Sequence, residues 1–125
     1  MTPLAERGSA PVELVLVGVL LVALVLGVLQ VAAVLYVRDT ALDAAAEGAR
    51  WAAIEGPAAG VDRTRAELTA ALGRTYAGDV RAGTGDEGGA PVAVVTVRAP
   101  LPVLGLLGPS GALQVTGHAA LEPAP

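Results

Sequence analysis

Hydrophobic residues are concentrated in one uninterrupted run near the start of the chain. The 24 residues at positions 14–37 include no Asp, Glu, Lys or Arg. A helix of that length rises by about 36 Å, which exceeds the bilayer's hydrocarbon thickness of about 30 Å. The pattern therefore predicts a membrane span over about residues 14–37. A buried helix in a soluble protein is disfavoured, because a chain of 125 residues has no second apolar mass large enough to surround it.

The helical pattern does not stop at the predicted membrane boundary. The following residues are rich in Ala and contain no Pro before Pro57, so we expect the helix to continue to about Ile54. Ala41, Ala45 and Ala49 recur at every fourth position and lie on one face of such a helix. Another helix could pack closely on this row of small side chains.

The remainder of the chain, residues 55–125, has the pattern of a small α+β domain. Gly56 and Pro57 end the long helix. Residues 61–77 then predict a second, amphipathic helix capped by Asp62, with apolar side chains on one face at Leu68, Leu72 and Tyr76. Residues 78–91 are so rich in Gly and charge that we interpret them as a flexible loop.

Two later segments have the pattern of β-strands. Residues 92–98 are mostly β-branched, and residues 113–121 place apolar and small side chains on one face and polar ones on the other. We expect an antiparallel hairpin or small sheet whose apolar side is covered by the second helix. The predicted fold class is α+β: a long N-terminal transmembrane helix that continues outside the membrane, a short helix, and this C-terminal sheet.

The segment between the predicted strands, residues 100–111, is apolar and contains no charged residue. Exposed apolar surface usually marks an interaction site. We expect this loop to contact a partner or the core in preference to lipid, and the proposed contact residues are Leu104, Leu106 and Leu107.

Charge and composition exclude several classes of function. The net charge of −4, without a basic cluster, argues against a nucleic-acid partner. The chain has no Cys and a single His, His118, and Asp86 with Glu87 lack the alternating acids of a calcium loop. No nucleophile with a base and no acid pair is recognisable. We expect a non-catalytic protein without a cofactor or a bound metal.

One carboxylate, Glu13, stands at the edge of the apolar run. An ionised side chain in hydrocarbon costs roughly 2.5–3.5 kcal/mol unless it finds a partner. The surrounding sequence RGSAPVE resembles the processing site of type IV prepilins, which a prepilin peptidase cuts after a Gly and whose fifth mature residue is Glu. The resemblance implies that residues 1–8 are a leader, that cleavage falls between Gly8 and Ser9, and that the mature helix covers residues 9–54.

The same resemblance implies a role for Glu13 in subunit pairing. The carboxylate would accept a charge-assisted hydrogen bond from the amino-terminal ammonium of a neighbouring subunit, which neutralises both charges and fixes the register of the two helices. The alternative is an interfacial Glu whose carboxylate reaches the lipid headgroups.

The segment AAAEGARWAA, residues 44–53, is similar to the one that follows the membrane helix in TadE-like proteins of tight-adherence (Flp-type) pilus systems. Those proteins are minor pilins or pseudopilins. Glu47 and Arg50 are three positions apart on a helix and can form an ion pair. This pair either keeps the helix soluble or, with Trp51, marks a contact with the distal domain or a neighbouring subunit.

The resemblance implies a non-catalytic minor pilin or pseudopilin that takes part in assembling a tight-adherence pilus or a related type II/IV secretion machinery. The implied partners are the prepilin peptidase, other pilins or pseudopilins, inner-membrane platform proteins and the lipid bilayer. Arg7 and the initial amine precede the span while Arg38, Asp39 and Asp43 follow it, which favours a cytoplasmic amino terminus and a C-terminal domain outside the cytoplasmic membrane. The alternative is a single-pass membrane protein that keeps its amino terminus and binds a ligand or envelope component.

Overall fold

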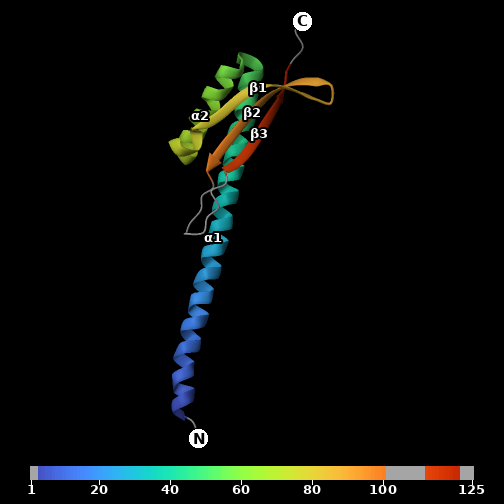
Figure 1. The fold of residues 1–125 in the computed structure, drawn as a ribbon. Coiled ribbons are helices and arrows are strands. Elements are labelled where there is room, and N and C mark those ends of the chain that lie inside the picture. The colour runs from blue at the N-terminus through green and yellow to red at the C-terminus, as the bar shows by residue number, and fades with distance from the viewer. Residues whose placement is uncertain (1–2, 101–111, 122–125) are drawn as a thin grey trace. The chain divides into compact units, whose positions relative to one another are not determined.

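The computed structural model describes residues 3–100 and 112–121 of the chain. Their elements, in chain order, are two helices, a 3-10 turn and three strands (Figure 1): α1 (Pro3–Glu55), α2 (Pro57–Leu72), η1 (Arg74–Ala77), β1 (Asp79–Glu87), β2 (Ala90–Pro100) and β3 (Ala112–Ala120). The predicted α+β fold class is confirmed. The chain divides into two compact units, Met1–Ala33 and Val34–Pro125.

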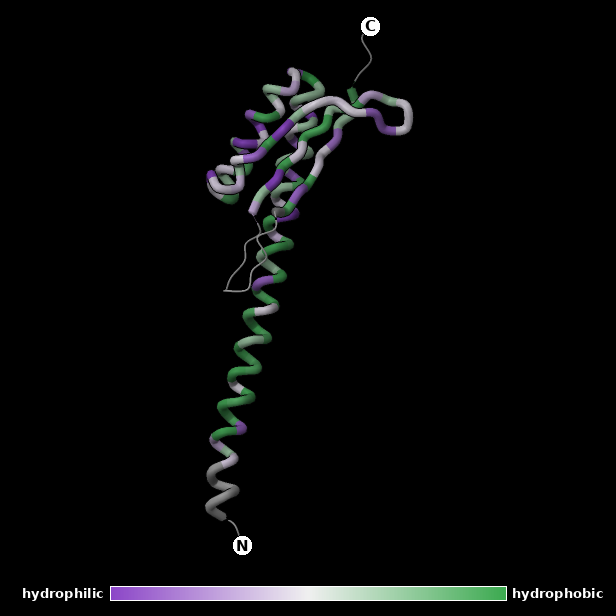
Figure 2. The backbone as a smooth tube through the Cα atoms, viewed as in Figure 1, coloured by the Kyte–Doolittle hydropathy of each residue, from purple (hydrophilic) through white to green (hydrophobic). Residues whose placement is uncertain are grey.

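The first unit contains the apolar part of α1. Among the described residues, the stretch Ser9–Glu55 is the one helix that is long and apolar enough to cross a membrane. Its large apolar side chains remain exposed, for example Leu14 at 74% and Leu20 at 68%, and the colours of Figure 2 show how little polar sequence interrupts them. Apolar surface of this extent is stabilised when a bilayer covers it.

In the second unit, α1 and α2 are joined by the single residue Gly56. Its φ of 102° lies in the left-handed region that favours glycine, and Pro57 opens α2 at the position where a missing N–H costs no hydrogen bond. The prediction that this helix starts at residue 61 with Asp62 as its cap was wrong, since Asp62 lies inside the helix. Gly56 therefore follows the end of α1, and Pro57 begins α2 directly after it.

The end of α2 also differs from the predicted boundary at residue 77. Gly73, with φ 99°, follows the last helical residue and its N–H donates to the carbonyls of Leu68 and Thr69, both at 3.1 Å. Tyr76 therefore lies in η1, while Leu68 is fully buried and Leu72 is half-buried.

The two helices of this unit approach each other through small residues. A side chain on Gly60 would lie 2.6 Å from Cβ of Ala52 and 2.7 Å from the carbonyl oxygen of Gly48, and one on Gly48 would collide with Oγ1 of Thr64. The Thr64 hydroxyl is buried and donates to the Gly60 carbonyl at 2.8 Å, with a longer contact of 3.4 Å to the Ala44 carbonyl. Close backbone approach between helices requires such residues.

The three strands form one antiparallel sheet in the order β1-β2-β3. The predicted strands at 92–98 and 113–121 are confirmed as β2 and β3. The interpretation of residues 78–91 as a flexible loop was wrong, because β1 pairs with β2 along its whole length, from Asp79 opposite Arg98 to Glu87 opposite Ala90. Gly88 and Gly89, with φ of 62° and 86°, form the two-residue turn of this hairpin.

The core lies between the sheet and both helices. Val95 and Val97 of β2 are fully buried in one cluster with Leu68 of α2 and with the predicted row of Ala41, Ala45 and Ala49, all three of which have no exposed surface. Gly117 of β3 lies directly against the backbone at Ala45, where a side chain would not fit. The prediction that the second helix covers the sheet is thus incomplete, since α2 contacts β1 and β2 while α1 lies against β3.

The proposed contact residues Leu104, Leu106 and Leu107 lie outside the described residues. Their role in contacting a partner or the core remains a prediction.

We predict that Gly48→Ala destabilises the second unit by roughly 1–3 kcal/mol, because the added methyl group must displace Thr64 or separate the helices. This cost exceeds the gain of about 1 kcal/mol that Ala brings to an open helix position. Thermal unfolding of the full chain in detergent, followed by circular dichroism and protease resistance, measures the loss. Gly83→Ala is the matched control, since no atom lies within 4 Å of a side chain there, and equal stability of the two variants would contradict the prediction.

Candidate functional site: a polar cluster on the helix hairpin

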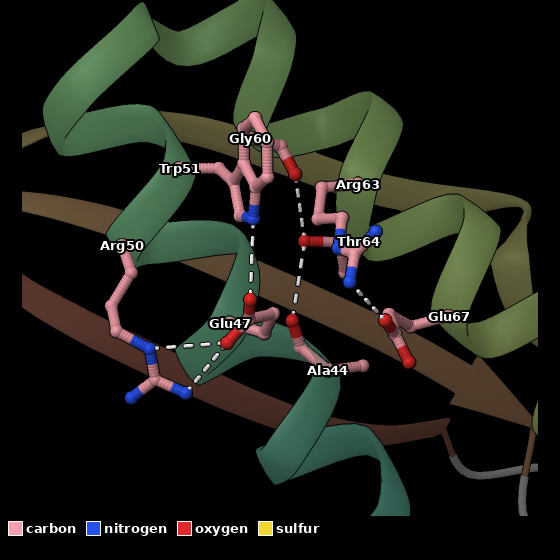
Figure 3. A network of polar contacts seen from close by, with 8 residues as sticks. All are labelled: Ala44, Glu47, Arg50, Trp51, Gly60, Arg63, Thr64 and Glu67. Atoms are coloured by element: carbon pink, nitrogen blue, oxygen red, sulfur yellow. Dashed lines mark hydrogen bonds and ion pairs between the residues drawn. The ribbon is translucent and has the colours of Figure 1, made fainter.

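The carboxylate of Glu47 is the centre of a polar cluster on the outer surface of α1 and α2 (Figure 3). Its Oε2 accepts hydrogen bonds from Nη2 of Arg50 at 2.8 Å and from Nε at 3.1 Å, while its Oε1 accepts one from the indole N–H of Trp51 at 3.2 Å. The predicted ion pair between Glu47 and Arg50 is therefore present. The three residues lie on one turn of α1, and the carboxylate holds both neighbouring side chains in place.

The cluster continues onto α2 through the Trp51 ring. The guanidinium of Arg63 lies 5.6 Å from the centroid of that ring, which is a cation–π distance. Arg63 also pairs with Glu67 at 2.9 Å. The helix hairpin thus brings Arg63 beside Trp51.

Hydrogen bonding lowers the pKa of Glu47 below its ordinary value. The main cause is the bond from Arg50, followed by the bond from Trp51, because both donors favour the ionised carboxylate. The charges of Arg50 and Arg63 act in the same direction, and partial burial opposes them. Glu47 is therefore ionised at neutral pH.

An open groove of about 510 Å³ lies beside this cluster on the second unit. Its lining includes the carboxylates of Asp43, Glu47 and Glu67 together with Arg50. Within the described part of the chain, no group of three or more His, Cys, Asp or Glu side chains is arranged to hold a metal ion. The arrangement presents paired charges and one partly exposed Trp, which is typical of a contact surface.

Three further predicted site residues lie in the first unit. Gly8, Ser9 and Glu13 are all within α1, and the side chain of Glu13 is exposed. Cleavage between Gly8 and Ser9 requires a peptidase, and pairing through Glu13 requires a second subunit. Both remain predictions.

Comparison with known proteins relates the first part of the chain to one family. The family model described as TadE-like protein matches residues 8–50, about a third of the chain. The resemblance expected from the sequence is thereby confirmed over those residues. No curated protein and no solved structure matches the chain.

Sequence reasoning missed the residues that allow the cluster to form. Gly48 directly follows Glu47 in the segment AAAEGARWAA, yet its importance depends on Gly60 and Thr64, which face it from α2. The spacing of four residues between Gly60 and Thr64 was a usable signal, because small residues at that spacing favour helix contact.

We predict that Glu47→Gln lowers the melting temperature at neutral pH and that the difference from the parent disappears in acid. A carboxylate whose pKa is lowered by folding contributes stability above the ordinary value of 4.5, and this contribution is lost as the pH falls through the lowered pKa. The effect is small because the pair is partly exposed, and salt reduces it. Thermal melts of both proteins across an acid-to-neutral pH series measure it. Glu55→Gln is the control, and a difference that persists unchanged at the acid end would contradict the account.

Proposed function

We propose that this protein is a minor pilin or pseudopilin that is processed by a prepilin peptidase and takes part in assembling a tight-adherence pilus or a related secretion machinery. The observation that carries the proposal is the family match over residues 8–50, which begins at the Gly of the proposed cleavage site. The protein acts by binding other subunits, without catalysis. Its membrane helix lies in the cytoplasmic membrane with the C-terminal domain outside.

The mature chain in this proposal begins at Ser9, so the helix loses the leader and keeps its whole apolar run. Glu13 then lies about one turn from the new amino terminus. An exposed carboxylate beside exposed Val12 and Leu14 is costly in hydrocarbon, and a neighbouring subunit's ammonium offsets this cost. The apolar helix surface serves first as a membrane anchor and then as the packing surface between subunits.

The second unit supplies the surface that distinguishes this subunit from its partners. Trp51 and Arg50 are exposed enough to contact another protein, and Glu47 holds them in fixed positions. Rigid aromatic and Arg side chains lose little entropy on binding and are favoured at interfaces. This surface, together with the loop residues Leu104, Leu106 and Leu107, is the proposed contact with other pilins or platform proteins.

Processing is the first test of the proposal. Coexpression with the prepilin peptidase of the same organism should shorten the chain by its first eight residues, residues 1–8, and expose Ser9. Gly8→Val should block this, because a peptidase that approaches the backbone closely has no room for the side chain. Intact-mass spectrometry of the membrane-extracted protein measures the length of the parent chain and of the Gly8→Val variant. An uncleaved parent chain would instead favour the membrane-anchored ligand-binding alternative.

Pairing through Glu13 is the second test. Glu13→Gln should still insert and be cleaved, but its assembly with other subunits should fall by roughly tenfold or more, since the neighbour's ammonium is left without its charged partner. The measurement is the fraction of the protein that cross-links to other pilins, divided by its total in the membrane. Gln30→Glu combined with Glu13→Gln tests position, because an acid elsewhere in the helix should not restore assembly. Undiminished cross-linking of Glu13→Gln would show that the carboxylate only reaches the headgroups.

A further inference from the structure

β3 forms an edge of the sheet and has few features that would prevent it from pairing with a strand of another chain. Among the described residues, it is hydrogen-bonded to β2 alone. Its nine residues, ALQVTGHAA, include no Asp, Glu, Lys, Arg or Pro, which are the residues that normally prevent an edge strand from pairing with another chain. The composition of this edge therefore favours the addition of a further strand.

A groove of about 650 Å³ lies between the end of this edge and the last turns of α1. Its lining from α1 is Arg50, Ala53 and Ile54, and from β3 it is His118, Ala119 and Ala120. Ile54 is 82% exposed, and the side chain of Arg50 is 63% exposed with Nη1 not used in its bonds to Glu47. An apolar wall beside a fixed cation and an exposed imidazole fits an extended segment that carries carboxylates.

The opposite edge of the same sheet, β1, has this complementary character. Asp86 and Glu87 are exposed at its end, where the β1–β2 hairpin extends past the helices (Figure 1). Asp86 uses one oxygen to accept the Gly89 N–H at 2.8 Å, which leaves its other oxygen available. Gly83 and Gly85 add no side-chain bulk beside the edge of this strand, where another strand would pair.

We propose that β3 of one copy of this protein binds β1 of a second copy, extending the sheet across the contact. The two strands run parallel, so that their C-terminal ends meet: Asp86 then lies on the helix-covered face, toward Arg50 of the first copy, and Glu87 lies on the opposite face, toward His118. The contact joins two different surfaces, so it leaves one edge free on each copy and can repeat along a row. It uses only surfaces of the second unit and does not depend on the proposed role in a pilus.

Cysteine cross-linking of the purified full chain in detergent tests this contact. The chain has no Cys of its own, so Gln114→Cys on one tagged copy and Arg81→Cys on a second, differently tagged copy mark the two edges; both positions are exposed and lie on the same face of the sheet. A short bis-maleimide reagent should give several-fold more mixed dimer than either homodimer. Arg65→Cys, on the exposed side of α2, replaces Arg81→Cys as the matched control and should give little mixed dimer.

A charge exchange identifies the occupant of the groove. His118→Glu on the β3-labelled copy should lower the mixed dimer by roughly tenfold, and Asp86→Arg with Glu87→Arg on the β1-labelled copy should restore it. Restoration also shows that His118→Glu has not unfolded the domain. Homodimers of the Gln114→Cys copy in excess, or a mixed dimer insensitive to the exchange, would overturn the proposal. Because no peptidase or other pilin is present, these outcomes are separate from those of the processing and Glu13 experiments.

Discussion

Close approach through small residues is the constraint on which the second unit depends. The chain contains no Phe, and the buried core of this unit is made mostly of Ala and Val. Side chains of that size fill the space between elements only where the backbones come very near each other. Gly48 and Gly60 allow this between the two helices, and Gly117 allows it between β3 and α1. A methyl group added at any of the three positions would push these backbones apart.

The polar cluster follows from the same close contact. Trp51 lies on α1 and Arg63 on α2, and their cation–π distance of 5.6 Å exists because the hairpin holds the helices together. Glu47 adds local order by binding Arg50 and Trp51 at once. The net stabilisation from these exposed contacts is small. Their main effect is to fix the positions of an Arg and a Trp on the surface, and fixed side chains of this kind suit a contact with another protein.

The two units of the chain have different kinds of surface. The first presents apolar side chains along α1 that are exposed and suited to a bilayer or to other apolar helices. The second buries a core of mainly Ala and Val and, within the described residues, presents charged groups, an open groove beside α1 and α2, and two sheet edges without a strand partner. The family match covers α1 from residue 8 to residue 50 and stops before α2. The part that resembles TadE-like proteins is therefore the helix, which carries the proposed contact residues Glu13, Glu47 and Arg50, while Trp51, α2 and the sheet lie outside the matched range.

Local chemistry determined the features that the sequence predicted correctly. A long run without charge predicts an apolar helix, β-branched alternation predicts β2 and β3, and a spacing of three predicts the Glu47–Arg50 pair, because each pattern acts over a few neighbouring residues. Tertiary structure decided the rest. Residues 79–87 are poor strand formers with several Gly and charged side chains, and they become β1 because β2 offers a complete row of hydrogen-bond partners. Likewise, nothing in the neighbouring sequence requires Gly at position 48. Gly is required there because Gly60 and Thr64 of α2 pack so closely against it that a side chain would not fit.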